Sequence, residues 1–169
     1  MKKLVIALVV ALGLGLLPVM SGAANATEIA IVDVNKILTD STPAKAGEDH
    51  LKKVQEVLQK GLNDVIELYK GKENTPEAQQ DVAQAYSALN QQMAIEQQAV
   101  RQVLEGLLIE SAKEWRAKNT KYDIVMNSAL LMDYNNKMDA TAAVLKIFNT
   151  KKAEFPALPQ VTVNKPAGQ

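Results

Sequence analysis

Two short apolar runs, one at each end of a long helical pattern, limit the folds that this chain can adopt. The first run is 28–33 (EIAIVD) and the second is 122–127 (YDIVMN). β-Branched and other apolar residues dominate both runs, which are too short for helices, so each predicts a strand. The helical pattern between them breaks once, over 70–76 (KGKENTP). We therefore expect the chain to leave a small sheet as a helix, reverse, and return to the same sheet, which makes a helical hairpin arm.

The first helix of this arm is expected to begin at Thr42-Pro43 and to end near Gly71. Threonine is a favoured N-cap, proline suits the first turn, and glycine commonly follows the last turn. The apolar residues recur at helical spacing and form one narrow stripe. They are Leu51, Val54, Leu58, Leu62, Val65 and Tyr69. Gly61 lies inside this pattern and weakens the helix locally by up to about 1 kcal/mol relative to alanine.

The second helix is expected from Pro76 to Lys118, with Thr75 as its N-cap. Its apolar stripe comprises Val82, Tyr86, Leu89, Met93, Val100, Leu104, Leu107 and Trp115. Glu96-Gln97 interrupts the stripe, so a soft place is predicted part-way along the arm. A compact four-helix bundle is the alternative architecture, but it needs wider apolar faces and further long helices.

The residues after the second run predict the rest of a small body. The segment 129–134 (ALLMDY) predicts a further strand, and Asp139-Ala140-Thr141 is expected to cap a short terminal helix. Such a body is too small to stand alone, and the chain has no cysteine to link it, so other copies are expected to complete it. The predicted body-core and trimer residues are Ile29, Ile31, Val32, Ile124, Val125, Met126 and Leu130.

These elements divide the chain into a signal peptide, a body, an arm and a tail. The body comprises 27–41 and 120–150, and the arm comprises 42–119. The tail, 151–169, contains several prolines and lysines and is expected to be disordered or extended.

The N-terminus carries the pattern of a secretory signal peptide over residues 1–26. Met1-Lys2-Lys3 is basic, the segment 4–17 is apolar, and Ala24-Asn25-Ala26 is a small-x-small cleavage site. The apolar segment is shorter than the ~20 residues of a membrane-spanning helix, although an uncleaved anchor is the alternative. We expect export and cleavage after Ala26. Removal of Lys2 and Lys3 leaves 17 basic against 19 acidic residues, which argues against a nucleic-acid partner.

Four segments together resemble the Skp/OmpH family of periplasmic chaperones, over the chain from residue 27 to about 149. They are 29–38 (IAIVDVNKIL), 42–46 (TPAKA), 122–127 (YDIVMN) and 139–141 (DAT) followed by Val144-Leu145. The resemblance implies an α+β fold with a small β-barrel body, completed by trimerisation, and a long antiparallel α-helical coiled-coil hairpin arm. It also implies a periplasmic homotrimer that holds unfolded outer-membrane proteins without ATP and prevents their aggregation.

Neither a catalytic constellation nor a cofactor or metal motif stands out in the sequence, so an enzyme is not expected. His50 is the only histidine and is expected to be a solvated residue of the first helix rather than a metal ligand. Asp33 and Asp123 flank strands, and capping is the favoured interpretation over acid–base chemistry. Trp115 is expected to pack at the root of the arm.

Lysines concentrate on the first helix and the tip of the arm, and two interpretations remain. They can pair with acids of the second helix, or Lys70 and Lys72 at the tip can contact anionic client segments, the membrane surface or lipopolysaccharide. Exposed pairs contribute only ~0–1 kcal/mol each, so energy does not decide between them. The near-neutral charge makes the lipopolysaccharide contact weak. The alternative function is a structural or adaptor trimeric coiled-coil protein of the cell envelope with one fixed partner.

Overall fold

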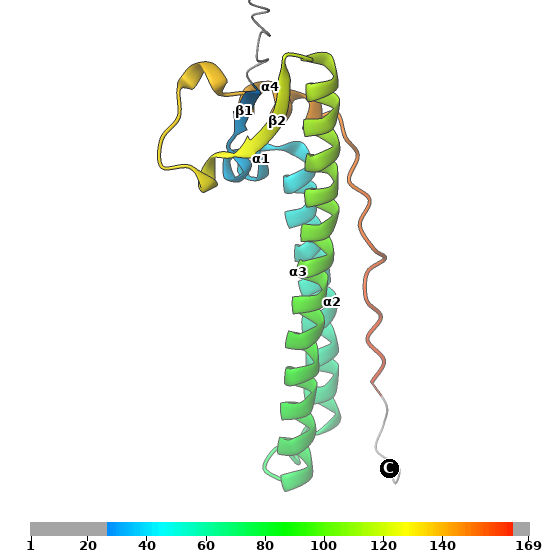
Figure 1. Ribbon diagram of the computed structural model, residues 1–169. Coiled ribbons are helices and arrows are strands. Elements are labelled where there is room, and N and C mark those ends of the chain that lie inside the picture. Colours follow the sequence, from blue (N-terminus) through cyan, green and yellow to red (C-terminus); the bar gives the residue numbers. More distant parts are fainter. Residues whose placement is uncertain (1–26, 164–169) are drawn as a thin grey trace, which may run out of the picture.

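The computed structural model describes residues 27–163, so the predicted signal peptide, 1–26, and the last residues, 164–169, lie outside the described range. Within that range the chain is an α+β fold, mostly helical with one two-stranded sheet (Figure 1). The elements in chain order are β1 Glu28–Val32, α1 Val34–Asp40, α2 Thr42–Leu68, α3 Pro76–Lys118, β2 Tyr122–Asn127, the 3₁₀ turns η1 Ser128–Leu130 and η2 Asn136–Met138, and α4 Thr141–Phe148.

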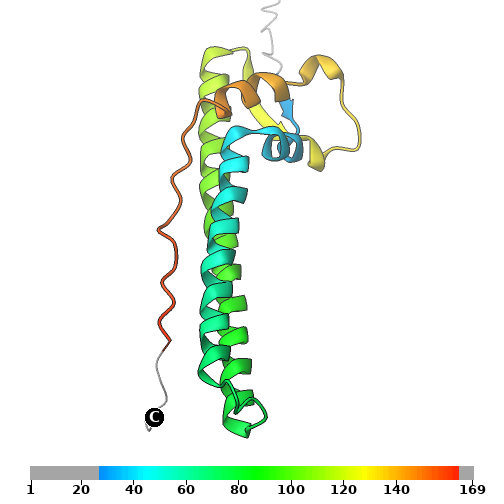
Figure 2. The same cartoon turned by 180° about the vertical axis from the view of Figure 1, so that it is seen from behind.

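The long helices α2 and α3 lie side by side and antiparallel, and they form the arm that the sequence predicts (Figures 1 and 2). The N-cap of α3 is Thr75, as predicted, and its hydroxyl accepts a hydrogen bond from Ala78 N at 3.2 Å. The N-cap of α2 is Ser41 rather than Thr42, because Ser41 separates α1 from α2 and its Oγ faces the first turn of α2. Gly71 adopts φ 80° in the turn between the helices, where only glycine fits easily.

The sheet pairs β1 with β2 in parallel, and Ile31 lies opposite Met126. Parallel neighbours cannot be joined by a tight turn and need a long crossover connection. Here the connection is α1 together with the whole hairpin, so the arm grows out of the body. The two apolar runs at the ends of the helical pattern are therefore both strands and adjacent to each other, as predicted.

The core of the body lies between the sheet, α1, α4 and the root of α3. It comprises Ala30, Val32, Ile37, Leu108, Trp115, Ala140, Val144 and Phe148. The ring of Trp115 lies 5.1 Å from that of Tyr122, which confirms that the tryptophan packs at the root of the arm. Asp33 caps α1 by accepting a hydrogen bond from Lys36 N at 2.9 Å, as predicted. Thr141 Oγ1 accepts from Asp33 N at 2.8 Å and joins α4 to the end of β1.

The predicted strand over 129–134 is wrong. Asn127 Oδ1 accepts a hydrogen bond from Ala129 N at 3.0 Å and turns the chain out of the sheet into η1. The chain then forms an irregular loop that projects from the body (Figure 1). Because the loop has no neighbouring strand to pair with, the apolar side chains of Leu130 and Met132 stay exposed.

The described part of the tail, 151–163, is an extended segment that runs from α4 along the hairpin toward the tip (Figures 1 and 2). Side chains of the tail pack against α2 at Gly47 and Gly61.

Candidate functional site

An open apolar groove near the tip of the hairpin is the most distinctive surface of the described chain. It has a volume of about 680 Å³. Leu62 and Ile66 of α2, with Tyr69 just after it, face Ala78, Val82 and Tyr86 of α3 across the groove. Glu73, Gln79 and Ala83 complete the lining. Glu73 is the one charged residue among these lining residues. The groove can therefore contact apolar side chains and has little means of attracting a charged ligand.

The groove exists because each helix carries a narrow apolar stripe. Two such stripes cover each other only along their centre, so apolar residues at the flanks stay in water. Ile66 is 44% exposed and Tyr86 is 59% exposed. Exposed apolar residues are common singly, but a lined and continuous apolar surface usually marks an interaction site.

A tyrosine–aspartate pair ties the two helices together beside the groove. Tyr69, which is buried, donates a hydrogen bond from its hydroxyl to Asp81 Oδ2. This hydrogen bond, followed by burial and the negative charge of Asp81, raises the pKa of Tyr69 to about 12. The tyrosine therefore stays neutral at physiological pH and acts as a fixed tie between α2 and α3.

A second, smaller groove of about 260 Å³ continues from the first toward the body. Leu58 of α2 and Leu89 and Met93 of α3 line it together with the amides of Gln55, Gln59 and Asn90, and it shares Leu62 and Tyr86 with the groove at the tip. We call the two together the open groove. It offers a row of apolar contact points along one side of the arm, which suits an elongated partner.

The body has its own exposed apolar surface. Ile109 of α3 and Ile124 of β2 lie exposed around a depression that is also lined by Ala112, Lys113, Arg116, Asp123 and Val125. Leu130 and Met132 lie exposed on the nearby loop. This surface belongs to β2, which in the described chain pairs with β1 only.

The predicted body-core residues divide between the inside and the outside of this subunit. Ile31 and Val32 are buried, and Ile29, Val125 and Met126 are half-buried. Ile124 and Leu130 are exposed, so they take no part in the core of the single chain.

The lysines of the arm pair within their own helix where they pair at all. Lys70 Nζ lies 2.8 Å from Glu67 Oε1, and Lys52 Nζ lies 3.5 Å from Asp49 Oδ1. Among the described residues no lysine of α2 pairs with an acid of α3, so the predicted lysine pairing across the hairpin is wrong. Lys70 and Lys72 are both exposed at the tip.

His50 is not the solvated residue that the sequence suggests. Its Nε2 lies 3.8 Å from Glu96 Oε2 across the hairpin, and its ring stacks on Phe155 of the tail with centroids 5.2 Å apart. Glu96 is buried and accepts a hydrogen bond from Gln92 Nε2 at 2.8 Å. The polar interruption of the stripe of α3 is thus a contact with His50. The available signal was that His50 and Glu96 lie at matching heights on antiparallel helices.

Residues 27–163 contain no cluster of histidine and acidic side chains able to hold a metal ion. No helix there combines the length and apolar character needed to span a membrane.

Comparison with known proteins adds a similarity to solved structures. No protein-family profile and no curated protein matches the chain. Among solved structures, it is similar to a crystal structure of a protein proposed to be an OmpH-like outer membrane chaperone from Caulobacter crescentus. The identity is 14% and the TM-score 0.45, with 83% of this chain and 94% of the other covered.

Proposed function

We propose that this protein is an ATP-independent holdase chaperone of the periplasm, which binds unfolded outer-membrane proteins and prevents their aggregation. The observation that carries the proposal is the open groove, an apolar surface left in water along a projecting arm. The signal-peptide pattern of residues 1–26 and the sequence resemblance to the Skp/OmpH family support it.

The groove suits a client that has no fixed shape. Each apolar side chain that a client buries there contributes at roughly 25 cal/mol per Å² removed from water, without demanding a particular sequence. Individual contacts of this kind are weak, but several arms acting on one chain raise the overall affinity through effective concentration. Since Glu73 is the only charge in the lining of the tip groove, capture by charge contributes little. Contact between Lys70 or Lys72 and an anionic client or membrane is a secondary part of the proposal.

We infer that the functional unit is a homotrimer. A two-stranded sheet is marginal on its own, and strands from other copies would extend it into the barrel-like body that the resemblance implies. The exposed side chains of Ile109, Ile124, Leu130 and Met132 support this inference, because association would remove them from water.

Light scattering from an unfolded porin diluted out of urea tests the function. The mature protein at stoichiometric ratio is expected to suppress the scattering without ATP. Undiminished aggregation would contradict the proposal. A pull-down dominated by one folded envelope protein, in place of many β-barrel clients, would favour the adaptor alternative.

A further inference from the structure

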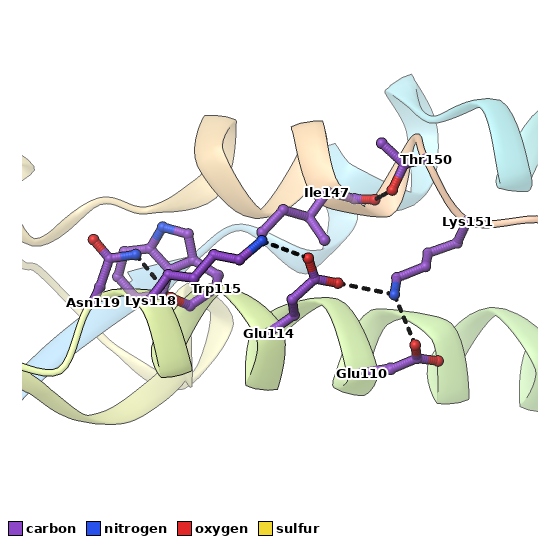
Figure 3. Close-up of polar contacts among 8 residues, drawn as sticks. All are labelled: Glu110, Glu114, Trp115, Lys118, Asn119, Ile147, Thr150 and Lys151. Atoms are coloured by element: carbon purple, nitrogen blue, oxygen red, sulfur yellow. Dashed lines mark hydrogen bonds and ion pairs between the residues drawn. The ribbon is translucent and has the colours of Figure 1, made fainter.

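The tail segment 151–163 starts from a charged anchor on α3. Lys151 Nζ donates hydrogen bonds to Glu110 Oε1 at 2.7 Å and to Glu114 Oε2 at 3.0 Å (Figure 3). The hydrogen bond to Glu110, followed by that to Glu114, raises the pKa of Lys151. Lys118 Nζ also lies 2.8 Å from Glu114 Oε1. From this anchor the tail runs along the hairpin toward its tip (Figures 1 and 2).

Two glycines of α2 lie under two side chains of the tail. A Cβ atom at Gly47 would lie 2.9 Å from Val100 Cγ1 of α3 and 3.4 Å from Phe155 Cζ, so this glycine lets α3 approach closely while Phe155 rests in ordinary contact on it. A Cβ atom at Gly61 would lie 2.9 Å from Val161 Cβ. Contacts under 3.0 Å are essentially never seen for real Cβ atoms, so any other residue at Gly61 would displace the valine. Gly61, which weakens the middle of α2, therefore leaves a notch that Val161 of the tail fills.

The spacing of the two glycines matches the spacing of the two tail side chains that lie on them. Gly47 and Gly61 are 14 residues apart, which is about 21 Å along a helix at about 1.5 Å per residue. Phe155 and Val161 are six residues apart, which is about 20 Å along an extended chain at about 3.3 Å per residue. The helix face is thus in register with an extended polypeptide.

Side chains, rather than backbone pairing, hold the tail in this groove. Across 153–163, as far as the structure describes it, no hydrogen bond joins the tail to either helix. Phe155 stacks on His50, which faces Glu96 from the other side of the hairpin. Val161 remains 37% exposed although it fills the notch. A segment that stays partly exposed and makes no backbone hydrogen bonds to the helices can be exchanged for another extended segment.

We propose that this notched groove, formed by Gly47 and Gly61 of α2 with the facing side of α3, is a polypeptide-binding groove. It takes extended segments with an aromatic and a β-branched residue six positions apart, and the tail is its displaceable intramolecular occupant. The inference rests on the proposed function, because the competing segments are those of an unfolded client. The notched groove is distinct from the open groove. The depression around Thr162 and Val163 of the tail shares only Tyr69 with the lining of the open groove.

The tethered tail lowers the apparent affinity of the groove for any segment from outside. A short tether gives the tail an effective concentration in the millimolar range. The apparent Kd for an outside segment is then the Kd of the free groove divided by the fraction of molecules whose groove is free. Clients therefore enter when they present many segments at once, and the tail closes the groove again after they leave.

Two full-length variants separate this role from that of a structural strap. F155A/V161A frees the tail and leaves the notch at Gly61 open, whereas G61L frees the tail and fills that notch. G106L is the matched control, since a Cβ at Gly106 meets nothing within 4 Å and the substitution gains the same helix propensity. The probe is a fluorescein-labelled peptide with the sequence of residues 151–163, and binding is followed by fluorescence anisotropy.

Opposite effects of the two tail-freeing variants are expected. F155A/V161A should bind the peptide about tenfold more tightly than the natural chain, G61L should bind it at least as weakly as the natural chain, and G106L should match the natural chain. K151M, which removes the anchor, is a second tail-freeing variant and should also bind more tightly. Equal behaviour of F155A/V161A and G61L, or no gain in F155A/V161A and K151M, would overturn the inference.

Competition with a client distinguishes this inference from the proposed function. Unlabelled unfolded porin should displace the labelled peptide from F155A/V161A. Peptide binding without displacement would overturn the client role of the notched groove, while suppression of porin aggregation by the natural chain would still support the holdase. Displacement without suppression of aggregation would contradict the holdase and leave the groove intact.

Discussion

Replacing both exposed flank residues of the open groove, I66S/Y86S, should weaken client binding and leave the fold unchanged. Burying such a side chain fully is worth about 1.5–3 kcal/mol. Since Ile66 is 44% and Tyr86 is 59% exposed, a client can still bury roughly half of each, or about 1 kcal/mol per residue. The pair then contributes about 2 kcal/mol, which is about a 30-fold change in Kd for one arm. Substitutions at such exposed positions usually change stability by no more than about 0.5 kcal/mol.

The assay measures the Kd of a fluorescently labelled unfolded porin and the light scattering of the same porin on dilution. I95S is the matched control, because Ile95 is 59% exposed on α3 but does not line the open groove. The double variant should bind about 30-fold more weakly and the control should bind as the natural chain does. If the two bind alike, or if I66S/Y86S binds at full strength with unchanged circular dichroism, the open groove is not the client surface.

Three further predictions concern stability. F148A empties a fully buried position in the core of the body and should lower the free energy of unfolding by about 3–5 kcal/mol in urea titrations; a loss under 1 kcal/mol would contradict the proposed core. T75A removes the hydroxyl that caps α3 at Ala78 and should cost about 1 kcal/mol, seen as a lower Tm, whereas T75S should retain the cap; equal Tm values would refute it. The pKa of Tyr69 is raised to about 12, so the tyrosine's contribution to the free energy of unfolding is complete below pH 10 and is lost as pH rises from 10 to 12. This part of the pH dependence should be absent from Y69F when unfolding is measured across that range.

The sequence predicts the elements whose signals are local. The Thr75-Pro76 pair contains its own capping group and first-turn residue, and α3 begins and ends where the pattern predicts. The strands β1 and β2 follow from apolar runs too short for helices, and their pairing follows because one crossover must return to the same sheet. Each of these conclusions needs only neighbouring residues or the order of elements.

What the sequence analysis missed depends on partners far along the chain. The apolar residues of 129–134 predict a strand, but the single chain offers no neighbouring strand to pair with, so the segment forms a loop. Glu96 interrupts the apolar stripe of α3, and His50 is expected in solvent, so only their approach across the hairpin gives them a shared role. From the sequence, Gly61 only weakens the helix, because the contact with Val161 of the tail lies 100 residues further along the chain.

Sedimentation of the mature protein with and without one equivalent of an unfolded porin tests assembly and client binding together. We expect a trimer at micromolar concentration that takes up one porin chain and keeps it soluble. A stable monomer, or a trimer that sediments unchanged while the porin aggregates, would contradict it.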